Sequence, residues 1–263
     1  MFTLFDLDMV PNTKPVAPHL AALPAFDLSR IALLLDVDGT LLDLAARPDE
    51  VQVPNDLREV LKSLTECRHC VLALVSGRSA TQLDALFAPA KLPLIGCHGA
   101  EIRSTSDAPV QRRPPLDENI RRELYAIAQS FPGTLLEDKT YSIALHYRSA
   151  PSLETPLSRA ANELIAHHPM LEILGGKAVI EFKPRGYDKA TACTALLANP
   201  PFRGRTPVFL GDDITDERVF RILPEFSGIG ISVGRAMQGA DYMLRSPAAV
   251  RAWLRELIAR DDR

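Results

Sequence analysis

The chain has 263 residues, of which 46% are hydrophobic and 24% are charged, and its formal net charge is −3 at pH 7. This is the composition of an ordinary globular protein, long enough for one large domain or for a domain with an insert. The balance of charge excludes the strongly basic surface that binding to nucleic acid or to anionic membranes requires. Since no apolar run reaches the ~20 residues of a membrane-spanning helix, we expect a cytoplasmic protein without a membrane partner.

The first 29 residues are rich in proline and lack the basic start and long apolar centre of a signal peptide. They contain an Asp-x-Asp sequence, FDLD, from Phe5 to Asp8. No apolar strand precedes this sequence and no Gly-Thr follows it. We therefore interpret residues 1–29 as a flexible N-terminal tail.

After the tail, short apolar runs alternate with amphipathic helical stretches. Strands are predicted at 31–36 and 71–76, a strand and turn at 93–99, and helices at 55–66 and 79–87, the latter with Ser79 as N-cap. Apolar strands that alternate with helices are typical of a parallel sheet covered on both faces.

The pattern changes between residues 104 and 183. Polar and apolar residues alternate in TYSIALHYR (140–148) and KAVIEFK (177–183), and helical stretches occupy 116–130 and 153–168. Alternation with a period of two leaves one face of a strand wet. We therefore predict a small antiparallel sheet with two helices against it.

The strand and helix rhythm then resumes. Helices are predicted at 188–199, 215–223 and 247–259, the last with Pro247 in its first turn, and strands at 207–213 and 228–234. The fold class is therefore α/β, with a Rossmann-like parallel-sheet core at residues 30–103 and 184–263. An α+β insert at residues 104–183 interrupts this core.

The four cysteines (Cys67, Cys70, Cys97 and Cys193) are too few and too scattered for a disulfide framework. Cys67 and Cys70 form a CRHC sequence, but no second CxxC or HxxxH pair accompanies it as a zinc site would require. A redox CxxC opens a helix, whereas CRHC closes one. We interpret it as a turn between the helix at 55–66 and the strand at 71–76.

Polar residues directly follow three of the predicted strands. They are Asp36 and Asp38, then Ser76, Gly77 and Arg78, then Asp212 and Asp213. Ligands of open parallel sheets bind outside the carboxyl ends of the strands. Carboxylates crowded at that edge raise one another's pKa unless a cation neutralises them, and Mg²⁺ is the usual hard cation with oxygen ligands.

The same edge has groups that suit an anion. Gly39 and Thr40 follow Asp38, where a sharp turn can bring backbone N–H groups toward a ligand. The Ser76 hydroxyl and the Lys189 ammonium are further candidates. A metal, amides, a hydroxyl and a lysine around one carboxylate are the groups that phosphoryl transfer uses.

The sequences DVDGT (36–40), SGR (76–78), Lys189 and GDD (211–213) occur in this order. They resemble the four motifs of the haloacid dehalogenase-like phosphatases, over nearly the whole chain after the tail. The resemblance implies a core of the haloacid dehalogenase type, and it makes the insert a cap domain that determines specificity. It also implies that Asp36 is the nucleophile that becomes an aspartyl-phosphate.

Further roles follow from the same resemblance. Asp38 is expected to act as general acid and base, and Thr40, Ser76, Gly77 and Lys189 to bind phosphate. Mg²⁺ is expected on the Asp36 and Asp212 carboxylates and the Asp38 carbonyl. Asp213 and Asp216 are expected to support these ligands, and Asp213 is also a candidate for binding the metal directly. Arg78 either contacts phosphate or pairs with a core carboxylate, which we favour, and His98 either reaches the substrate or completes a turn.

A closer resemblance rests on GDDITDE (211–217), the ExK of LLEDKTYSIALHYR and GGKAVIEFKPRGYDK. These stretches are similar to the trehalose-6-phosphate phosphatases, which catalyse the last step of trehalose biosynthesis. The resemblance implies a cap that binds the distal glucose and a functional pairing with a trehalose-6-phosphate synthase. The matching cap positions are Glu137, Lys139, Arg148, Lys177 and Glu181, side chains that donate to or accept from sugar hydroxyls.

Other interpretations stay open at this stage. On pattern alone, the charged cap residues describe a solvated sheet face with ion pairs. The same fold could hydrolyse sucrose-phosphate or mannosylglycerate-phosphate, while the GDDxTDE sequence argues against a phosphohexomutase. A non-catalytic regulatory domain would be expected to lose Asp36, Asp38 or Asp212, and all three are present.

Overall fold

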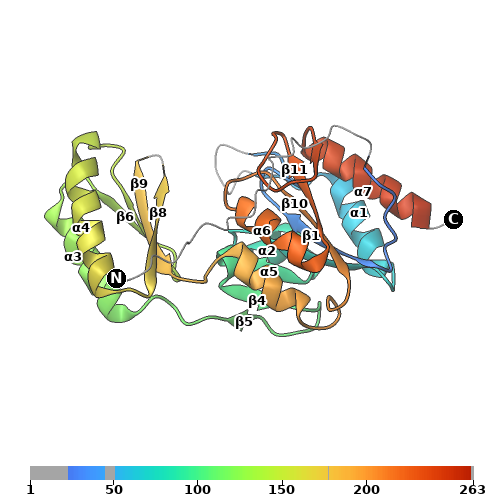
Figure 1. The fold of residues 1–263 in the computed structure, drawn as a ribbon, viewed down its shortest axis with the longest axis horizontal. Helices are drawn as coiled ribbons and strands as arrows, with labels where there is room; N and C mark the ends of the chain where they lie inside the picture. Colours follow the sequence, from blue (N-terminus) through green and yellow to red (C-terminus); the bar gives the residue numbers. More distant parts are fainter. Residues whose placement is uncertain (1–22, 45–50, 177, 262–263) are drawn as a thin grey trace, which may run out of the picture.

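The computed structural model describes residues 23–44, 51–176 and 178–261. The FDLD sequence, the tail up to residue 22 and Lys177 lie outside these residues. Two β-sheets organise the described chain, and each carries its own helices (Figure 1). We call the larger sheet with its helices the core and the smaller sheet with its helices the cap.

The core sheet has eight strands in the order β12-β11-β10-β1-β2-β3-β4-β5. Their bounds are Ile31–Asp36 (β1), Val71–Val75 (β2), Leu94–Gly96 (β3), Glu101–Arg103 (β4), Gln111–Arg112 (β5), Thr206–Gly211 (β10), Ile229–Val233 (β11) and Tyr242–Leu244 (β12). The strands from β12 to β3 pair in parallel, and β4 and β5 extend the sheet in antiparallel fashion. The predicted parallel core is thus confirmed.

Both faces of the core sheet are covered by helices, which explains why every residue of β1 is buried. One face carries α1 (Asn55–Glu66), α2 (Ala80–Leu86) and α7 (Pro247–Asp261), and the other carries α5 (Lys189–Leu197) and α6 (Glu217–Ile222). Helix α1 buries its apolar residues at the predicted spacing. Ser79 caps α2 in a capping box with Gln82, as predicted for the N-cap.

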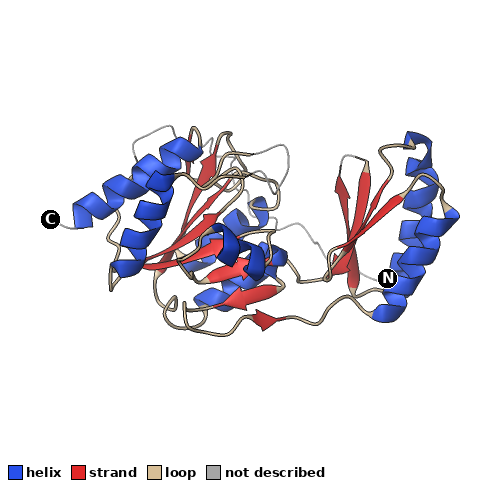
Figure 2. Ribbon diagram, turned by 180° about the vertical axis from the view of Figure 1, so that it is seen from behind, coloured by secondary structure: helices blue, strands red, loops and turns tan. Residues whose placement is uncertain are grey.

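The cap sheet is antiparallel, in the order β6-β7-β9-β8. Its elements are β6 (Leu135–Asp138), β7 (Ile143–His146), β8 (Leu171–Gly176) and β9 (Val179–Pro184), with α3 (Glu118–Ser130) and α4 (Glu154–His167) packed on one face. The other face of the sheet turns toward the core, as the view from behind shows (Figure 2). The predicted antiparallel sheet with two helices is confirmed.

The strand predicted at 140–148 is shorter in the structure, where β7 spans only Ile143–His146. A tight turn precedes it, in which the Lys139 N–H donates to the Ser142 carbonyl at 2.9 Å. Thr140 has a φ of +70° in this turn, a conformation that no β-strand has. The turn matters for the site because it brings Lys139 next to Ser142.

Two linkers join the core and the cap. Strand β5 pairs with β4 of the core sheet, so the chain leaves this sheet after Arg112, later than the expected boundary at residue 104. The linkers touch each other, since the guanidinium of Arg113 lies 5.0 Å from the ring centre of Tyr187 and the Tyr187 hydroxyl donates to the Pro114 carbonyl at 3.0 Å. No helix in the described part of the chain is long and apolar enough to cross a membrane.

The contact between α1 and α7 generates a stability prediction. Leu254 of α7 is completely buried in the same cluster as Leu57 and Leu61 of α1. Leu254→Ala should therefore lower the free energy of unfolding by about 2–5 kcal/mol, because it leaves a cavity in a packed core. Urea denaturation measures this loss. Leu44→Ala, at a residue that is 74% exposed, should change stability by less than about 0.5 kcal/mol, and an equal loss in both variants would contradict the packing.

Candidate active site

Three carboxylates meet at the carboxyl edge of the core sheet. Asp36 ends β1 and Asp212 follows the neighbouring strand β10, while Asp216 lies at the start of α6. Each offers an oxygen within 4.8 Å of the others. The turn after Asp38 passes very close to this group, because a Cβ on Gly39 would lie 2.1 Å from Asp212 Oδ2 and Gly39 has a φ of +84°. Only glycine fits there.

Lys189 is the cation at the centre of these carboxylates. It begins α5, behind the N-cap residue Asp188, and is buried. Its Nζ donates to Asp36 Oδ1 and to Asp216 Oδ1, both at 2.7 Å. Burial raises the pKa of Asp36 well above its ordinary value, although the charge of Lys189 works against that rise.

Asp216 positions the loop that follows β10. Its Oδ2 accepts from the backbone N–H groups of Asp212 and Asp213, each at 3.0 Å, while its Oδ1 accepts from Lys189. Both Asp216 oxygens are therefore engaged. Asp213, which we considered as a metal ligand, is exposed and bonds the N–H of Ile214, and the carboxylate cluster contains Asp216 in its place.

The cluster has the composition of a site for a hard divalent cation. Asp36 and Asp212 lie close enough to share a hydrogen bond, and burial also raises the pKa of Asp212. Lys189 offsets only one of the three negative charges. Two like-charged carboxylates in contact favour either a shared proton or a cation between them. The oxygen ligands and the buried surplus charge fit Mg²⁺.

Asp38 and Arg78 form a two-pronged ion pair beside this cluster. The Nε and Nη2 of Arg78 donate to the two carboxylate oxygens of Asp38, both at 2.7 Å. The hydrogen bond with Asp38 raises the pKa of Arg78. Arg78 thus pairs with a core carboxylate, the role that we favoured from the sequence. Its partner is the residue expected to act as acid and base.

The expected phosphate ligands lie at the same edge but have partners within the protein. Ser76 is buried after β2, and its hydroxyl oxygen accepts from the N–H of Arg78 at 3.1 Å. The Thr40 hydroxyl donates to Asp212 Oδ1 at 3.2 Å. The N–H groups of Gly39 and Thr40 donate to carbonyls of their own turn, and not toward a ligand as we expected. This turn therefore contributes by ordering Asp212.

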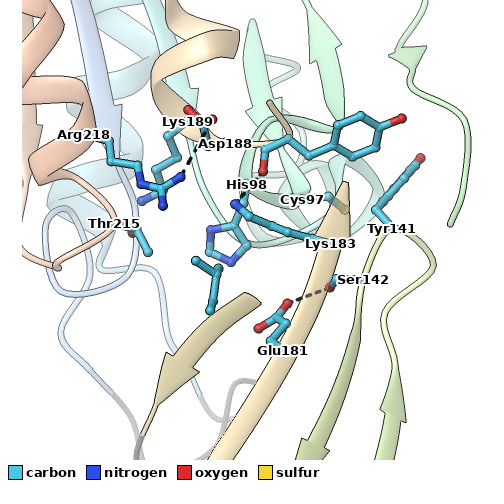
Figure 3. Close-up of a pocket in the computed structure, with 12 residues that line it drawn as sticks. Cys97, His98, Tyr141, Ser142, Glu181, Lys183, Asp188, Lys189, Thr215 and Arg218 are labelled. Carbon is cyan, nitrogen blue, oxygen red and sulfur yellow. Dashed lines mark hydrogen bonds and ion pairs between the residues drawn. The ribbon is translucent and has the colours of Figure 1, made fainter. Parts of the chain in front are cut away.

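A cavity of about 190 Å³ lies between the core and the cap, with Lys189 in its wall. Figure 3 shows side chains of both bodies around it. The core and linker contribute Cys97, His98, Tyr187, Asp188, Lys189, Thr215 and Arg218, and the cap contributes Tyr141, Ser142, Leu174, Glu181 and Lys183. A ligand here would contact the buried lysine and the open face of the cap sheet at once.

Three of the expected sugar-binding residues come together on the cap. Glu137, Ala144, Glu181 and Leu174 form one row across the sheet, so their side chains share a face. Lys139 Nζ lies 3.3 Å from Glu181 and 3.8 Å from Glu137. Burial alone would raise the pKa of Glu181, but the hydrogen bond from Ser142 and the charge of Lys139 outweigh it and lower that pKa.

Arg148 is not part of this group. It lies beyond the far end of β7, is exposed, and is not among the residues that line the cavity. Lys177 lies outside the described residues. The structure therefore assembles Glu137, Lys139 and Glu181 but does not bring Arg148 to them.

His98 projects into the cavity from a strained turn. It has a φ of +52°, and its backbone N–H donates to the Ser76 carbonyl at 3.0 Å. Its ring packs so closely on Gly77 that a Cβ there would lie 2.4 Å from Nε2. The ring keeps accessible surface because it faces the cavity, but burial between the two bodies and then the charge of Lys189 lower its pKa to about 4.

No pattern in the sequence indicated that several of the cavity residues would lie there. Ser142 donates to Glu181 at 2.6 Å, and Lys183 donates to the Tyr187 carbonyl at 2.8 Å. Arg218 of α6 reaches Glu172 of the cap at 3.5 Å and Asp188 at 4.0 Å. Asp188 was within reach of prediction, because an aspartate before the first residue of a helix is a standard N-cap. Arg218 was not, since its partner Glu172 lies in the other body.

Comparison with known proteins gives consistent matches. A family model described as trehalose-phosphatase matches residues 34–245. The trehalose-6-phosphate phosphatase of Escherichia coli (strain K12) is 38% identical over 246 residues, 92% of this chain and 90% of the relative.

Solved structures share the fold. That of trehalose-6-phosphate phosphatase from Aspergillus fumigatus superposes with a TM-score of 0.73 at 23% identity, over 91% of this chain and 100% of the other. A haloacid dehalogenase-like hydrolase from B. subtilis gives 0.64 at 15% identity, over 87% and 99%. The predicted fold class is confirmed.

Removal of the buried lysine tests the charge balance of the site. Lys189→Met should destabilise the protein by about 3–5 kcal/mol, because it leaves buried carboxylates without their cation. Adding Asp36→Asn should recover part of this loss, since one of the buried charges disappears. Chemical denaturation of the single and double variants measures both effects. Lys62→Met on the exposed surface of α1 is the control. A double variant that is no more stable than Lys189→Met alone would contradict the pairing.

The position of His98 predicts its titration. Its ring should remain neutral down to about pH 4, whereas a histidine that is fully surrounded by water titrates near pH 6.5. Because the pKa in the folded state lies below that in the unfolded state, unfolding takes up a proton between these values. Stability should therefore fall as the pH drops through this window, and less so in His98→Asn. NMR titration of the imidazole, assigned with that variant, checks this, and a midpoint near 6.5 would contradict it.

Proposed function

Because this chain belongs to the trehalose-phosphatase family of phosphoric monoester hydrolases, we propose that its substrate is trehalose 6-phosphate. One observation carries the proposal to this site. A single cavity has the Lys189 ammonium, which holds Asp36, in its core wall and Glu181 in its cap wall. A phosphate placed at the core would leave the sugar against the cap.

Asp36 is the proposed nucleophile. Its carboxylate attacks phosphorus, the bond between phosphorus and the sugar oxygen breaks, and an aspartyl-phosphate forms. Asp38 gives a proton to the leaving sugar oxygen and later takes one from the water that attacks phosphorus. That second step releases phosphate and restores the Asp36 carboxylate. Lys189 fixes one Asp36 oxygen at 2.7 Å and so orients the other for attack.

The ion pair between Asp38 and Arg78 constrains this sequence. Both Asp38 oxygens accept from Arg78, which fixes the orientation of the carboxyl group. Each oxygen keeps a second lone pair, so a proton can still bind there. The ion pair would therefore keep the carboxyl group aimed at the leaving oxygen while it gives and takes the proton.

The metal that we propose is Mg²⁺, held by the Asp36 and Asp212 carboxylates and the Asp38 backbone carbonyl. When bound, the ion supplies positive charge against the phosphoryl oxygens and lowers the pKa of the Asp36 carboxyl. Asp216 and Thr40 orient Asp212 through the bonds described above, and Asp213 remains a less direct candidate. Ser76, Gly77, Thr40 and Lys189 form the proposed phosphate site.

The cap residues Glu137, Lys139 and Glu181 are the proposed sugar ligands. Carboxylates accept hydrogen bonds from sugar hydroxyls, and an ammonium donates to them. The contacts of Lys139 with Glu181 at 3.3 Å and with Glu137 at 3.8 Å hold these side chains in position. Sugar hydroxyls would replace these contacts when the substrate binds. We further propose the cap, the part of residues 104–183 that follows Arg112, as the specificity domain, with a cytoplasmic location and a functional pairing with a trehalose-6-phosphate synthase.

Phosphate release tests the substrate and the chemistry together. We expect trehalose 6-phosphate to be hydrolysed in preference to sucrose 6-phosphate, glucose 6-phosphate and mannosylglycerate-phosphate. A chelator should abolish the activity, and Asp36→Asn should lower kcat by about 10³-fold or more, because the nucleophile is lost. Better turnover of another sugar phosphate would keep the chemistry and replace the substrate. If no phosphate is released from any of these substrates in the presence of metal, the proposed enzymatic activity is overturned and a regulatory domain is favoured.

Substitution in the cap separates sugar binding from chemistry. Glu181→Gln should lower kcat/KM for trehalose 6-phosphate about 10- to 200-fold. The kcat/KM of the variant for glucose 6-phosphate should stay close to that of the parent protein, because this substrate lacks the second sugar. Steady-state kinetics with both substrates measure the difference. Glu118→Gln, an exposed residue of α3, is the matched control. An equal loss for both substrates would place Glu181 in the phosphate site and not in sugar recognition.

A further inference from the structure

A second group of potential ligands lies at the opposite edge of the core sheet. Cys67, His69 and Asp261 place a sulfur, a nitrogen and an oxygen atom within 4.8 Å of one another. Cys67 Sγ lies 3.5 Å from His69 Nε2 and 3.7 Å from Asp261 Oδ2, and the latter two atoms are 2.7 Å apart. The group lies at the amino end of β2, whereas Ser76 and the active site lie at its carboxyl end. It has no contact with the catalytic residues.

The backbone holds this group in a fixed turn. Cys67 is the C-cap of α1, and its N–H donates to the Ser63 carbonyl. The N–H of Cys70 donates to the Cys67 carbonyl at 3.2 Å, which closes the turn before β2. Arg205 fixes the other side, because one of its nitrogens donates to the His69 carbonyl at 2.8 Å and also to the carbonyls of Leu28 and Ile31.

The ends of two helices meet here, which favours a cation. Helix α1 ends at Glu66 without a basic residue in its last turn, and α7 ends at Asp261. The carboxyl end of a helix carries partial negative charge, so a carboxylate at that position is unfavourable without a positive partner. Arg260, in the last turn of α7, points its charge to Glu256 at 3.7 Å instead.

The distances match tetrahedral zinc. Bonds of ~2.3 Å to sulfur and ~2.1 Å to nitrogen or oxygen hold the sulfur about 3.6 Å from the other two ligand atoms. The observed 3.5 and 3.7 Å agree with this. The contact of 2.7 Å between His69 and Asp261 is a hydrogen bond, and it would lengthen to about 3.4 Å around the metal. A shift of less than 1 Å at an exposed helix end is a small change.

We propose that Cys67 Sγ, His69 Nε2 and Asp261 Oδ2 bind a zinc ion that ties the end of α1 to the end of α7. A water molecule completes the four ligands. Binding releases the Cys67 thiol proton to solvent and uses the lone pair of neutral His69.

The CRHC sequence alone could not show this site, since its third ligand is 194 residues away from Cys67. The interpretation of CRHC as a helix-to-strand turn is correct, and α7 adds the ligand that the turn lacks. The role is structural, because the group joins two helices far from the carboxylates at the other edge of the sheet.

Cobalt substitution tests the proposal, with excess Mg²⁺ present to occupy the catalytic carboxylates. Titration of the full chain with Co²⁺ should give one equivalent with a thiolate-to-cobalt charge-transfer band in the near ultraviolet, and Zn²⁺ should displace it. Cys67→Ser should lose the band. Asp261→Asn should weaken binding at least about tenfold, because even the outer partners of metal ligands contribute that much. Circular dichroism confirms that each variant is folded.

The matched control is His168→Gln. His168 pairs with a carboxylate, Glu123, at 3.1 Å in the cap, and that contact includes no cysteine. This variant should bind Co²⁺ as the parent does. Zn²⁺ should also raise the Tm of the parent chain and of His168→Gln, but not that of Cys67→Ser. No charge-transfer band, or a band that persists in Cys67→Ser, would overturn the proposal.

Discussion

The buried contact of Lys189 with Asp36 and Asp216 organises the active site. It joins β1, the start of α5 and the loop before α6 through two hydrogen bonds of 2.7 Å. A buried charge is tolerated only with partners, so these elements must lie in register before the core can close. Asp216 passes the constraint on, because it also fixes the backbone of Asp212 and Asp213. The geometry of the carboxylates therefore depends on one cation.

The same interaction leaves the site with surplus negative charge. Three carboxylates form one cluster, the single ammonium of Lys189 contacts two of them, and burial raises the pKa of Asp36 and of Asp212. The surplus negative charge is unfavourable as long as no second cation is bound, and it therefore favours the binding of a divalent ion. The stability lost here is recovered elsewhere in the core, where the strands of the parallel sheet are buried between two helical layers.

The sequence predicted the core better than the cap, for a physical reason. Strand β1 and helix α1 were predicted with their observed bounds, because their apolar patterns reflect burial within the element itself. The motif residues of the core follow strand ends, and parallel strands end at the same edge. Arg148 lies beyond the end of β7 and does not line the cavity, because alternation predicts which face a residue occupies but not its position along the sheet. Arg218 and Asp261 depend on partners in distant elements, which no local spacing encodes.

The cap is attached to the core mainly by polar contacts, and this shapes how the cavity can work. Among the described residues, the apolar cluster of the cap shares no member with those of the core. The bridges are polar, such as the Tyr141 hydroxyl to Glu101 at 3.2 Å and Arg218 to Glu172 at 3.5 Å. The partly exposed contact of Arg218 contributes about 0–1 kcal/mol, whereas the buried hydrogen bond of Tyr141 to the Glu101 carboxylate contributes about 1.5–3 kcal/mol. A ligand that bridges Lys189 and Glu181 would add to the attraction between the cap and the core. Under the proposed function, a substrate with both a phosphate and a correctly placed sugar would hold the cap and the core together at this cavity.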